Sequence, residues 1–175
     1  MPKEKEYPTF EEVIQFIKRT HSLRDELLIR MLWDTAGRIS EVLSIRVGDF
    51  NFKERYVKMP VLKRKKPEYK YIPLPKETIR LALLYIKHKK LKPADRLFNI
   101  SRQRADQIIK NITRNKYSCH DFRHGKAIYL LHHKRANLNL VRNFLAHKDL
   151  KTTSIYLTLP KNQIIDMFKP FVEEY

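Results

Sequence analysis

The sequence predicts a mainly α-helical protein with one small antiparallel β-sheet, a fold of the α+β class. Over most of the chain the apolar residues recur with the period of a helix, and β-rich runs are confined to residues 55–74. A chain of 175 residues fits one domain and can bury about 70% of the surface of its unfolded form. We therefore expect residues 1–175 to form a single domain, without a flexible linker or an internal repeat.

Two motifs indicate where the first helices begin. Thr9-x-x-Glu12 and Ser22-x-x-Asp25 have the spacing of capping boxes, in which a hydroxyl and a carboxylate satisfy free backbone N–H groups at a helix start. The second helix is expected to run to about Thr35.

A short helix over residues 39–44 should follow Gly37, at which the second helix stops. Next come two β-rich runs, residues 55–62 and 69–74, joined by a cationic loop, and this arrangement is typical of a β-hairpin. From Lys76 the helical period returns, in the segments ETIRLALLYIKHKK, RQRADQIIKNIT, HDFRHGKAIYLLHH, LNLVRNFLA and KNQIIDMFKPFV.

The chain is strongly basic, with 37 Lys and Arg residues against 19 Asp and Glu. The excess is concentrated, because residues 53–76 and residues 101–135 each carry nine basic and two acidic side chains, whereas residues 1–26 carry five and six. Basic side chains bind a polyanion by releasing counterions from its phosphates. We expect double-stranded DNA to be the partner. A lysine-rich surface of the kind found in hyperthermophilic proteins is the alternative.

Other features of the sequence concern its compartment. No run approaches the roughly 18 apolar residues of a membrane span, and no charged-then-apolar leader begins the chain. Cys119 is the only cysteine, so an internal disulfide is impossible. We expect a soluble, intracellular protein that associates with DNA and not with a membrane.

Several polar residues stand where packing does not require them. Arg38 begins the short helix, and Glu41 lies one turn later, where it can orient the guanidinium; an ordinary surface ion pair is the alternative. His120 and Arg123 are likewise one turn apart, in HDFRH. The apolar residues expected on the buried side of that helix are Phe122, Ile128 and Leu131.

These residues lie in boxes that resemble those of the tyrosine recombinases, the phage integrase and Xer group. TAGRISEVLSIRVGDF is similar to their first box, HDFRH to the second, and LAHKDLKTTSIY to the third, which ends in a tyrosine nine residues after its histidine. Two departures are that Gly37 directly precedes Arg38 and that Ala146 replaces a glycine. The resemblance runs from about residue 8 to the end of the chain. It implies the fold of a tyrosine recombinase catalytic domain.

The resemblance also implies a set of functional residues. The catalytic residues would be Arg38, Lys65, His120, Arg123, His147 and Tyr156, with Glu41 in a supporting role. The family's catalytic lysine lies in the hairpin turn, about eight residues before an Ile/Val-Pro pair, and counting back from Pro73 gives Lys65. Its neighbours in the turn are expected to bind DNA, namely Lys63, Arg64 and Lys66.

These residue types suit the transfer of a phosphodiester. Arg38 and Arg123 can pair with phosphate oxygens through a planar fork that stays charged, and a histidine can accept the tyrosine proton. Tyr156 would attack to form a 3′-phosphotyrosine, and Lys65 would protonate the departing 5′ oxygen. No step needs a metal, another cofactor or ATP. The implied function is that of a site-specific recombinase or integrase.

The resemblance carries expectations about the assembly as well. Such enzymes usually have an additional N-terminal domain that binds the other face of the DNA, and we expect this chain to lack it. They act as tetramers on paired sites, so a homotetramer is implied. The last segment resembles the element that they pass to a neighbouring subunit, although such a stripe is more often plain core; its apolar residues are Ile164, Ile165, Phe168 and Val172.

Three other functions fit parts of the pattern. A non-catalytic DNA-binding module explains the charge, and a type IB topoisomerase shares the tyrosine and the cationic site but rejoins the same strand. A metal hydrolase would need ligands from the histidines, yet no glutamate lies between the first two of them. Those histidines are His120, His124, His132, His133 and His147.

Overall fold

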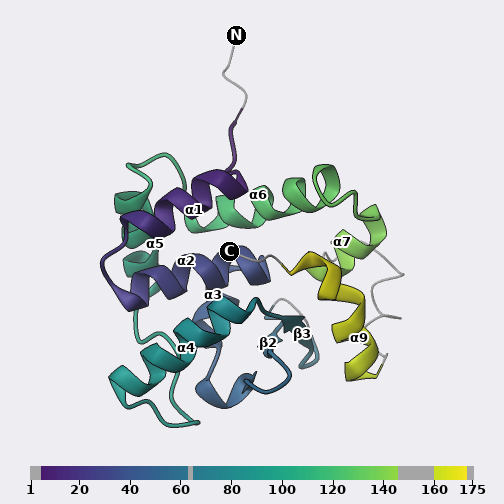
Figure 1. Cartoon of the computed structure of the whole chain (residues 1–175), viewed down its shortest axis with the longest axis horizontal. Helices are drawn as coiled ribbons and strands as arrows, with labels where there is room; N and C mark the ends of the chain where they lie inside the picture. The colour runs from purple at the N-terminus through teal and green to yellow at the C-terminus, as the bar shows by residue number, and fades with distance from the viewer. Residues whose placement is uncertain (1–4, 63–64, 146–159, 173–175) are drawn as a thin grey trace.

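The computed structural model describes residues 5–62, 65–145 and 160–172. The described helices and strands are α1 (Phe10–Arg19), α2 (Leu23–Thr35), α3 (Ile39–Ser44), η1 (Val47–Asp49), β1 (Phe50–Asn51), β2 (Tyr56–Pro60), β3 (Tyr69–Pro73), α4 (Lys76–Lys89), α5 (Arg102–Ile112), α6 (Cys119–His132), α7 (Leu138–Leu145), α9 (Lys161–Phe168) and η2 (Lys169–Phe171). Figure 1 shows a mainly helical molecule with one small sheet, as the sequence predicts. None of the helices in these ranges is long and apolar enough to cross a membrane.

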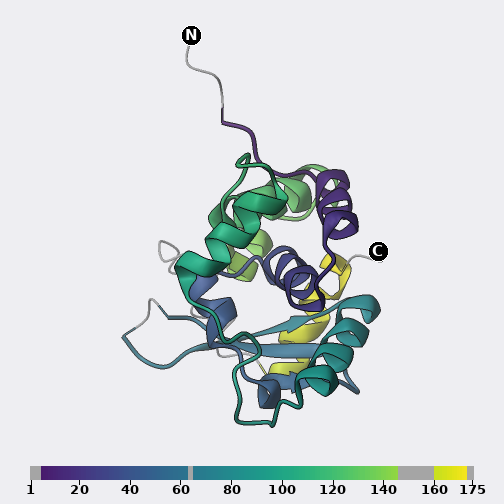
Figure 2. The same ribbon diagram turned by 90° about the vertical axis from the view of Figure 1, so that its left-hand side faces the viewer.

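Helix α2 lies at the centre of the molecule and packs against α1, α4 and α6 (Figures 1 and 2). Its second half is buried on every side, which is why its sequence lacks a clear polar face. The one acidic side chain in this half, Asp34, accepts a hydrogen bond from the Thr78 hydroxyl of α4 at 2.6 Å. This hydrogen bond therefore joins α2 to α4 and satisfies the buried Asp34 carboxylate.

The predicted capping motifs are present at the first two helices, one of them in full. At α1, the Thr9 N–H donates to the Glu12 carboxylate at 3.0 Å, and the Glu12 N–H donates to the Thr9 hydroxyl at 3.2 Å. At α2, the Ser22 hydroxyl accepts from the Asp25 N–H at 3.4 Å. The Asp25 carboxylate instead accepts from Arg24 Nε at 2.8 Å, so only half of the second box forms.

The end of α2 differs from the prediction in which residue makes the turn. The helix ends at Thr35, but Ala36 and not Gly37 adopts the left-handed conformation, with φ of 48°. A Cβ at Gly37 would lie 2.9 Å from the Met59 side chain of β2. A side chain at position 37 would therefore have to displace the end of the Met59 side chain, so the glycine allows the turn before α3 to lie close to β2.

The sheet has the antiparallel order β1-β2-β3 and includes the predicted hairpin. Strand β1 escapes prediction because a strand of two residues has no period to detect. Along β3, Lys70 pairs with Met59 and Ile72 pairs with Val57. All four side chains are buried, so one face of the hairpin lies on the core.

Helix α6 buries a face that its sequence does not predict. Phe122 is fully buried, as expected, but Ile128 is 42% exposed. Arg123 and Lys126 are instead almost fully buried. The expected apolar side was therefore wrong at Ile128, because two cations occupy the inward positions of this helix.

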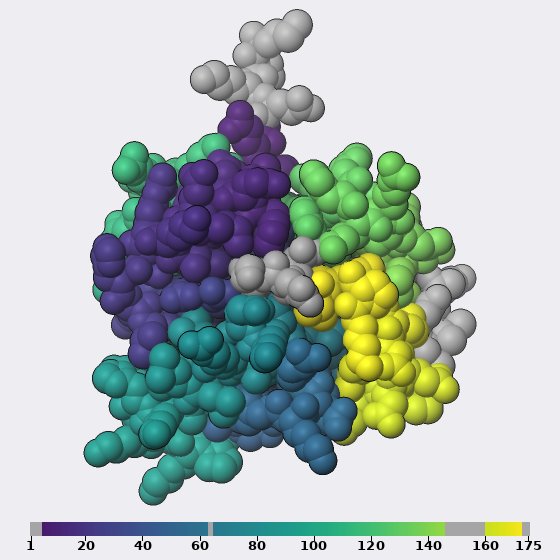
Figure 3. Space-filling model, viewed as in Figure 1, coloured from purple at the N-terminus to yellow at the C-terminus, as the bar shows by residue number. Residues whose placement is uncertain are grey.

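The C-terminal segment packs within its own chain. Helix α9 contacts β3, and the Phe144 ring of α7 lies 5.1 Å from the ring of Phe168 and 5.4 Å from that of Phe171. Ile164 and Ile165 are buried as well. In Figure 3, α9 and η2 appear in yellow as part of the molecular surface beside the hairpin and α7. The apolar stripe is thus core in this structure.

Candidate active site

The first predicted site residue, Arg38, is held by the buried carboxylate of Glu41. Arg38 occupies the N-cap of α3, and its N–H donates to Glu41 Oε2 at 3.0 Å. Its guanidinium Nη1 donates to Glu41 Oε1 at 3.1 Å. The Glu41 side chain is wholly buried, whereas that of Arg38 is 22% exposed. The pair is therefore not an ordinary surface ion pair, since a buried carboxylate fixes a guanidinium that reaches the surface.

Arg123 joins two other parts of the chain to the same place. Its Nη1 donates to the carbonyl of Ala36 at 2.8 Å, and its Nη2 donates to the carbonyl of Leu145 at 2.5 Å. Burial and, to a smaller extent, repulsion by Arg38 lower the pKa of Arg123 to about 10, against attraction by Glu41. The two guanidinium groups are therefore close enough to interact, although they come from α3 and α6. Arg123 stays charged at neutral pH.

His120 lies one turn before Arg123 on α6, at the surface. Burial of its ring lowers the pKa of His120, and the charges of His124 and Arg123 lower it further. The His120 and His124 rings meet edge to face with their centroids 4.7 Å apart. A histidine kept neutral in this way can accept a proton or donate one hydrogen bond.

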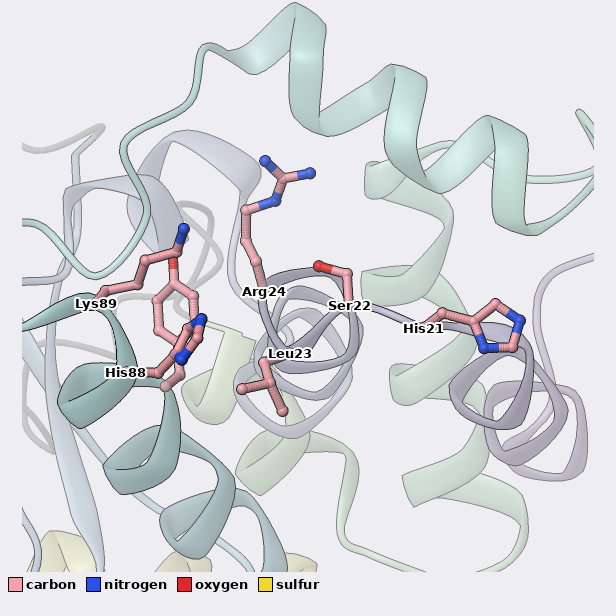
Figure 4. Close-up of a pocket in the computed structure, with 7 residues that line it drawn as sticks. His21, Ser22, Leu23, Arg24, His88 and Lys89 are labelled. Atoms are coloured by element: carbon pink, nitrogen blue, oxygen red, sulfur yellow. The ribbon is translucent and has the colours of Figure 1, made fainter.

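A cavity of about 520 Å³ opens beside His120, and Ile39 of α3 and Asp106 of α5 also line it. A second cavity, of about 390 Å³, lies between the start of α2 and the end of α4 (Figure 4). Its lining includes Arg24 and His88 but none of the predicted site residues. The candidate site is therefore the region of α3 and the first turn of α6.

The hairpin turn contributes exposed cations. Lys65 and Lys66 follow β2 and are exposed. Within the described part of the chain, no hydrogen bond or ion pair joins Lys65 to another residue. Lys63, Arg64, His147 and Tyr156 lie outside the described residues. The structure thus brings Arg38, Glu41, His120 and Arg123 together and leaves the assignments of the other predicted residues as predictions.

Sequence reasoning missed one residue of this region, Lys70. It lies on β3, is 2% exposed, and its Nζ donates to the carbonyl of Phe144 at 3.1 Å. Burial lowers the pKa of Lys70 to about 7; Glu41 opposes this shift, and Arg123 and Arg38 add to it. The signal in the sequence is that Lys70 stands two residues before Ile72, in the inward register of a strand.

The histidines of the hydrolase alternative do not form a metal site in the described residues. No three His, Cys, Asp or Glu side chains gather there in a way that could hold a metal ion. His124 instead lies against Tyr7, with ring centroids 5.0 Å apart.

A helical domain with a three-stranded sheet, in which two arginines from separate helices converge with an acidic residue and a histidine, has the architecture of a tyrosine recombinase catalytic domain. The phage integrase family matches residues 6–163, and the chain belongs to this family.

Individual relatives agree with this assignment. Tyrosine recombinase XerA of Saccharolobus solfataricus is 33% identical over 153 residues, which cover 85% of this chain and 50% of that protein. A tyrosine recombinase of Pseudothermotoga lettingae is 29% identical over 160 residues, which cover 86% and 55%. The chain spans about half the length of the curated relatives that it matches.

A solved structure shares the fold. The XerH site-specific recombinase bound to its difH substrate, in a pre-cleavage complex, superposes with a TM-score of 0.67 at 24% identity. The match covers 86% of this chain and 49% of that one.

Proposed function

We propose that this chain is the catalytic domain of a site-specific DNA recombinase that cleaves and rejoins strands through a 3′-phosphotyrosine. Tyr156 is the nucleophile, and its attack on the phosphorus expels the 5′ oxygen of the next nucleotide. Lys65 protonates that oxygen, and a histidine, His147 or His120, takes the tyrosine proton. The covalent bond preserves the energy of the phosphodiester, so a 5′ hydroxyl of another strand can rejoin it without ATP.

The observation that carries this proposal is the convergence of Arg38 and Arg123. Two guanidinium groups that repel each other are held together by buried contacts, and this arrangement suits an anion that develops charge during reaction. A phosphodiester placed between them would relieve the repulsion and accept several charge-assisted hydrogen bonds. The bonds from Arg123 to Ala36 and Leu145 use two of its N–H groups and leave the others for phosphate oxygens.

Double-stranded DNA is the proposed substrate. The net charge of +18 supports it, as does the solved complex of the related XerH recombinase with difH. The proposed active assembly is a homotetramer on two paired sites, in which Lys63, Arg64 and Lys66 of the hairpin contact DNA phosphates.

A suicide substrate tests the proposal. Such a duplex carries a nick close to the cleavage position. Cleavage therefore releases a short fragment that bears the free 5′ hydroxyl, this fragment diffuses away, and the covalent intermediate accumulates. Labelled random-sequence duplexes of this type, incubated with the protein in chelator, should give a DNA-linked protein band on a denaturing gel. Sequencing of the trapped strand then reports the target site.

The same experiment separates the alternatives. A DNA-binding module would shift the duplex on a native gel but give no denaturation-resistant band. A type IB topoisomerase would give the band and relax supercoiled plasmid without forming Holliday junctions. If the protein binds a selected DNA sequence but forms no denaturation-resistant band with a suicide substrate of that sequence, the proposal is overturned.

A further inference from the structure

A buried lysine lies beneath the candidate site and has no part in the proposed chemistry. Lys70 is 2% exposed, and its neighbours on the sheet are the apolar Met59 and Ile72. Burying an ammonium group costs free energy, which a methionine of similar length would avoid. Stability alone therefore does not account for a lysine here, and its contacts indicate another purpose.

Those contacts converge on the end of α7. The Lys70 ammonium donates to the carbonyl of Phe144 at 3.1 Å, and Arg123 Nη2 donates to the next carbonyl, that of Leu145. The last carbonyls of a helix have no partner within the helix and form the negative end of its dipole. Two cations, one from β3 and one from α6, thus bind successive carbonyls at the point where α7 ends.

The charges on either side complete this arrangement. Glu41 is fully buried and attracts Lys70, while Arg38 and Arg123 repel it. Glu41 is also the residue that holds the Arg38 guanidinium. A change at Lys70 should therefore affect both arginines of the site. It should affect Arg38 through the shared Glu41 carboxylate, and Arg123 through the carbonyls at the end of α7.

We propose that Lys70 is a positioning residue for the recombinase reaction: by holding the Phe144 carbonyl it keeps the Leu145 carbonyl on Arg123 and so fixes the Arg123 guanidinium beside Arg38. This inference rests on the proposed function for its effect on catalysis. Its structural part, the restraint of Arg123, stands independently. Lys70 is 2% exposed and has no role in the proposed chemical steps, so we expect removal of its amine to leave the chemistry possible but badly aligned.

The test compares Lys70→Met with Lys126→Met. Lys126 is a matched control because it is also a buried lysine, 1% exposed, whose Nζ reaches a backbone carbonyl, that of Phe171 at 3.5 Å. Both variants lose an ammonium group from the interior. We expect Lys70→Met to slow covalent adduct formation at saturating DNA at least about tenfold with DNA affinity within about twofold, and Lys126→Met to change both by less than about twofold.

A second readout does not depend on catalysis. In wild type and in Lys126→Met, the guanidinium protons of Arg123 should give an NMR signal protected from exchange with water, because two carbonyls hold a buried group. In Lys70→Met this signal should broaden and exchange at least about tenfold faster. Lys70→Gln replaces Lys70→Met in both measurements if the methionine variant does not fold; its uncharged amide nitrogen lies one bond closer to the backbone than the lysine Nζ, so it should lose the bond to the Phe144 carbonyl as well.

The outcomes are distinct. If wild type forms no adduct while the Arg123 signal responds to Lys70 as described, the proposed function fails and the positioning role survives. If Lys70→Met and Lys126→Met slow the adduct equally, or if the Arg123 signal is unchanged in Lys70→Met, the positioning role is wrong whatever the enzyme does.

Discussion

Arg123 donates a hydrogen bond across 2.8 Å to the carbonyl of Ala36, two residues before Arg38 in the chain. This bond links α6 to the turn from which α3 starts. It thereby holds the guanidinium group of Arg123 near that of Arg38, although the two residues belong to different helices. The left-handed conformation of Ala36 turns the chain at the end of α2, where its carbonyl meets Arg123. The backbone between α2 and α3 is thus part of the site.

Glu41→Gln should destabilise the fold by about 3 kcal/mol, because the amide keeps the shape of the carboxylate but leaves the buried positive charges around it without their counter-charge. Urea unfolding followed by circular dichroism measures the free energy of unfolding. Asp166→Asn is the control, since it breaks an exposed ion pair with Lys169 and should cost less than about 1 kcal/mol. Equal losses in the two variants would show that the Glu41 carboxylate does not balance the site.

Lys70 should make the stability of the protein depend on pH above neutrality. Its folded-state pKa is lowered to about 7 from 10.5, so between these values the unfolded chain binds more protons than the folded one. Stability relative to Lys70→Met should therefore rise with pH through this window, by at most about 1.4 kcal/mol per pH unit, and should not change with pH below it. Lys70 faces Glu41, Arg38 and Arg123, so the experiment includes Glu41→Gln, in which the rise should begin at lower pH. A difference between wild type and Lys70→Met that is constant from pH 6 to pH 9 would contradict this account.

The basic segments should make DNA binding strongly dependent on salt. If about six phosphates are neutralised, affinity for duplex DNA should fall by roughly three orders of magnitude between 50 and 200 mM salt. Charge reversal at Lys65 and Lys66 should flatten the slope of log affinity against log salt by about one for each lost phosphate contact. Fluorescence anisotropy with labelled duplex measures both slopes, and the same reversal at Lys87 and Lys89 of α4 is the control for net charge. An affinity that does not change with salt would contradict the interpretation that the basic segments bind DNA phosphates.

Lys65→Ala should slow cleavage of an ordinary strand but largely spare a substrate whose leaving group is a 5′-thiol. A thiolate leaves without a proton, so it does not need the general acid. Single-turnover cleavage of the two substrates gives the ratio of rates, and the neighbouring cations keep DNA binding nearly unchanged. Lys63→Ala and Lys66→Ala are matched controls from the same turn. Rescue in either of them, and not in Lys65→Ala, would move the general acid to that lysine.

The sequence predicts the local spacing of the candidate site residues but not the contacts that surround them, for a physical reason. Arg38, His120 and Arg123 belong to short motifs whose spacing follows the turn of one helix, so their local geometry is encoded nearby. The burial of Arg123 and Lys70 depends on carbonyls at Ala36, Phe144 and Leu145, which come from elsewhere in the chain.

In the fold, too, features set by the local sequence were predicted and features set by distant contacts were not. Most helix and hairpin bounds follow from local period and capping, and they were confirmed to within a few residues. The positions that failed were decided by packing between distant elements. The second helix was expected to stop at Gly37, but Ala36 makes the left-handed turn, and Ile128 was expected on the buried side of its helix, where Lys126 is buried instead.

The hydroxyl of Tyr156 provides the most direct test of the proposed reaction. Tyr156→Phe removes one oxygen and keeps the ring, so a packing residue would tolerate the change almost silently. If the oxygen is the nucleophile, the variant should fold and bind DNA normally yet form no covalent adduct, because a phenyl ring has no atom that can attack phosphorus.

The control for this change is Tyr129→Phe, in which a tyrosine of α6 loses its hydroxyl while its ring keeps its stacking on His133. Its adduct should match that of wild type. Arg38→Ala and Arg123→Ala should each lose several kcal/mol of transition-state stabilisation, so their adducts should form at least about a hundredfold more slowly. A denaturing gel of labelled suicide substrate, run for all variants in chelator, reports these rates side by side. A DNA-linked band from Tyr156→Phe as strong as that of wild type would mean that another residue is the nucleophile, and the mechanism would have to be abandoned.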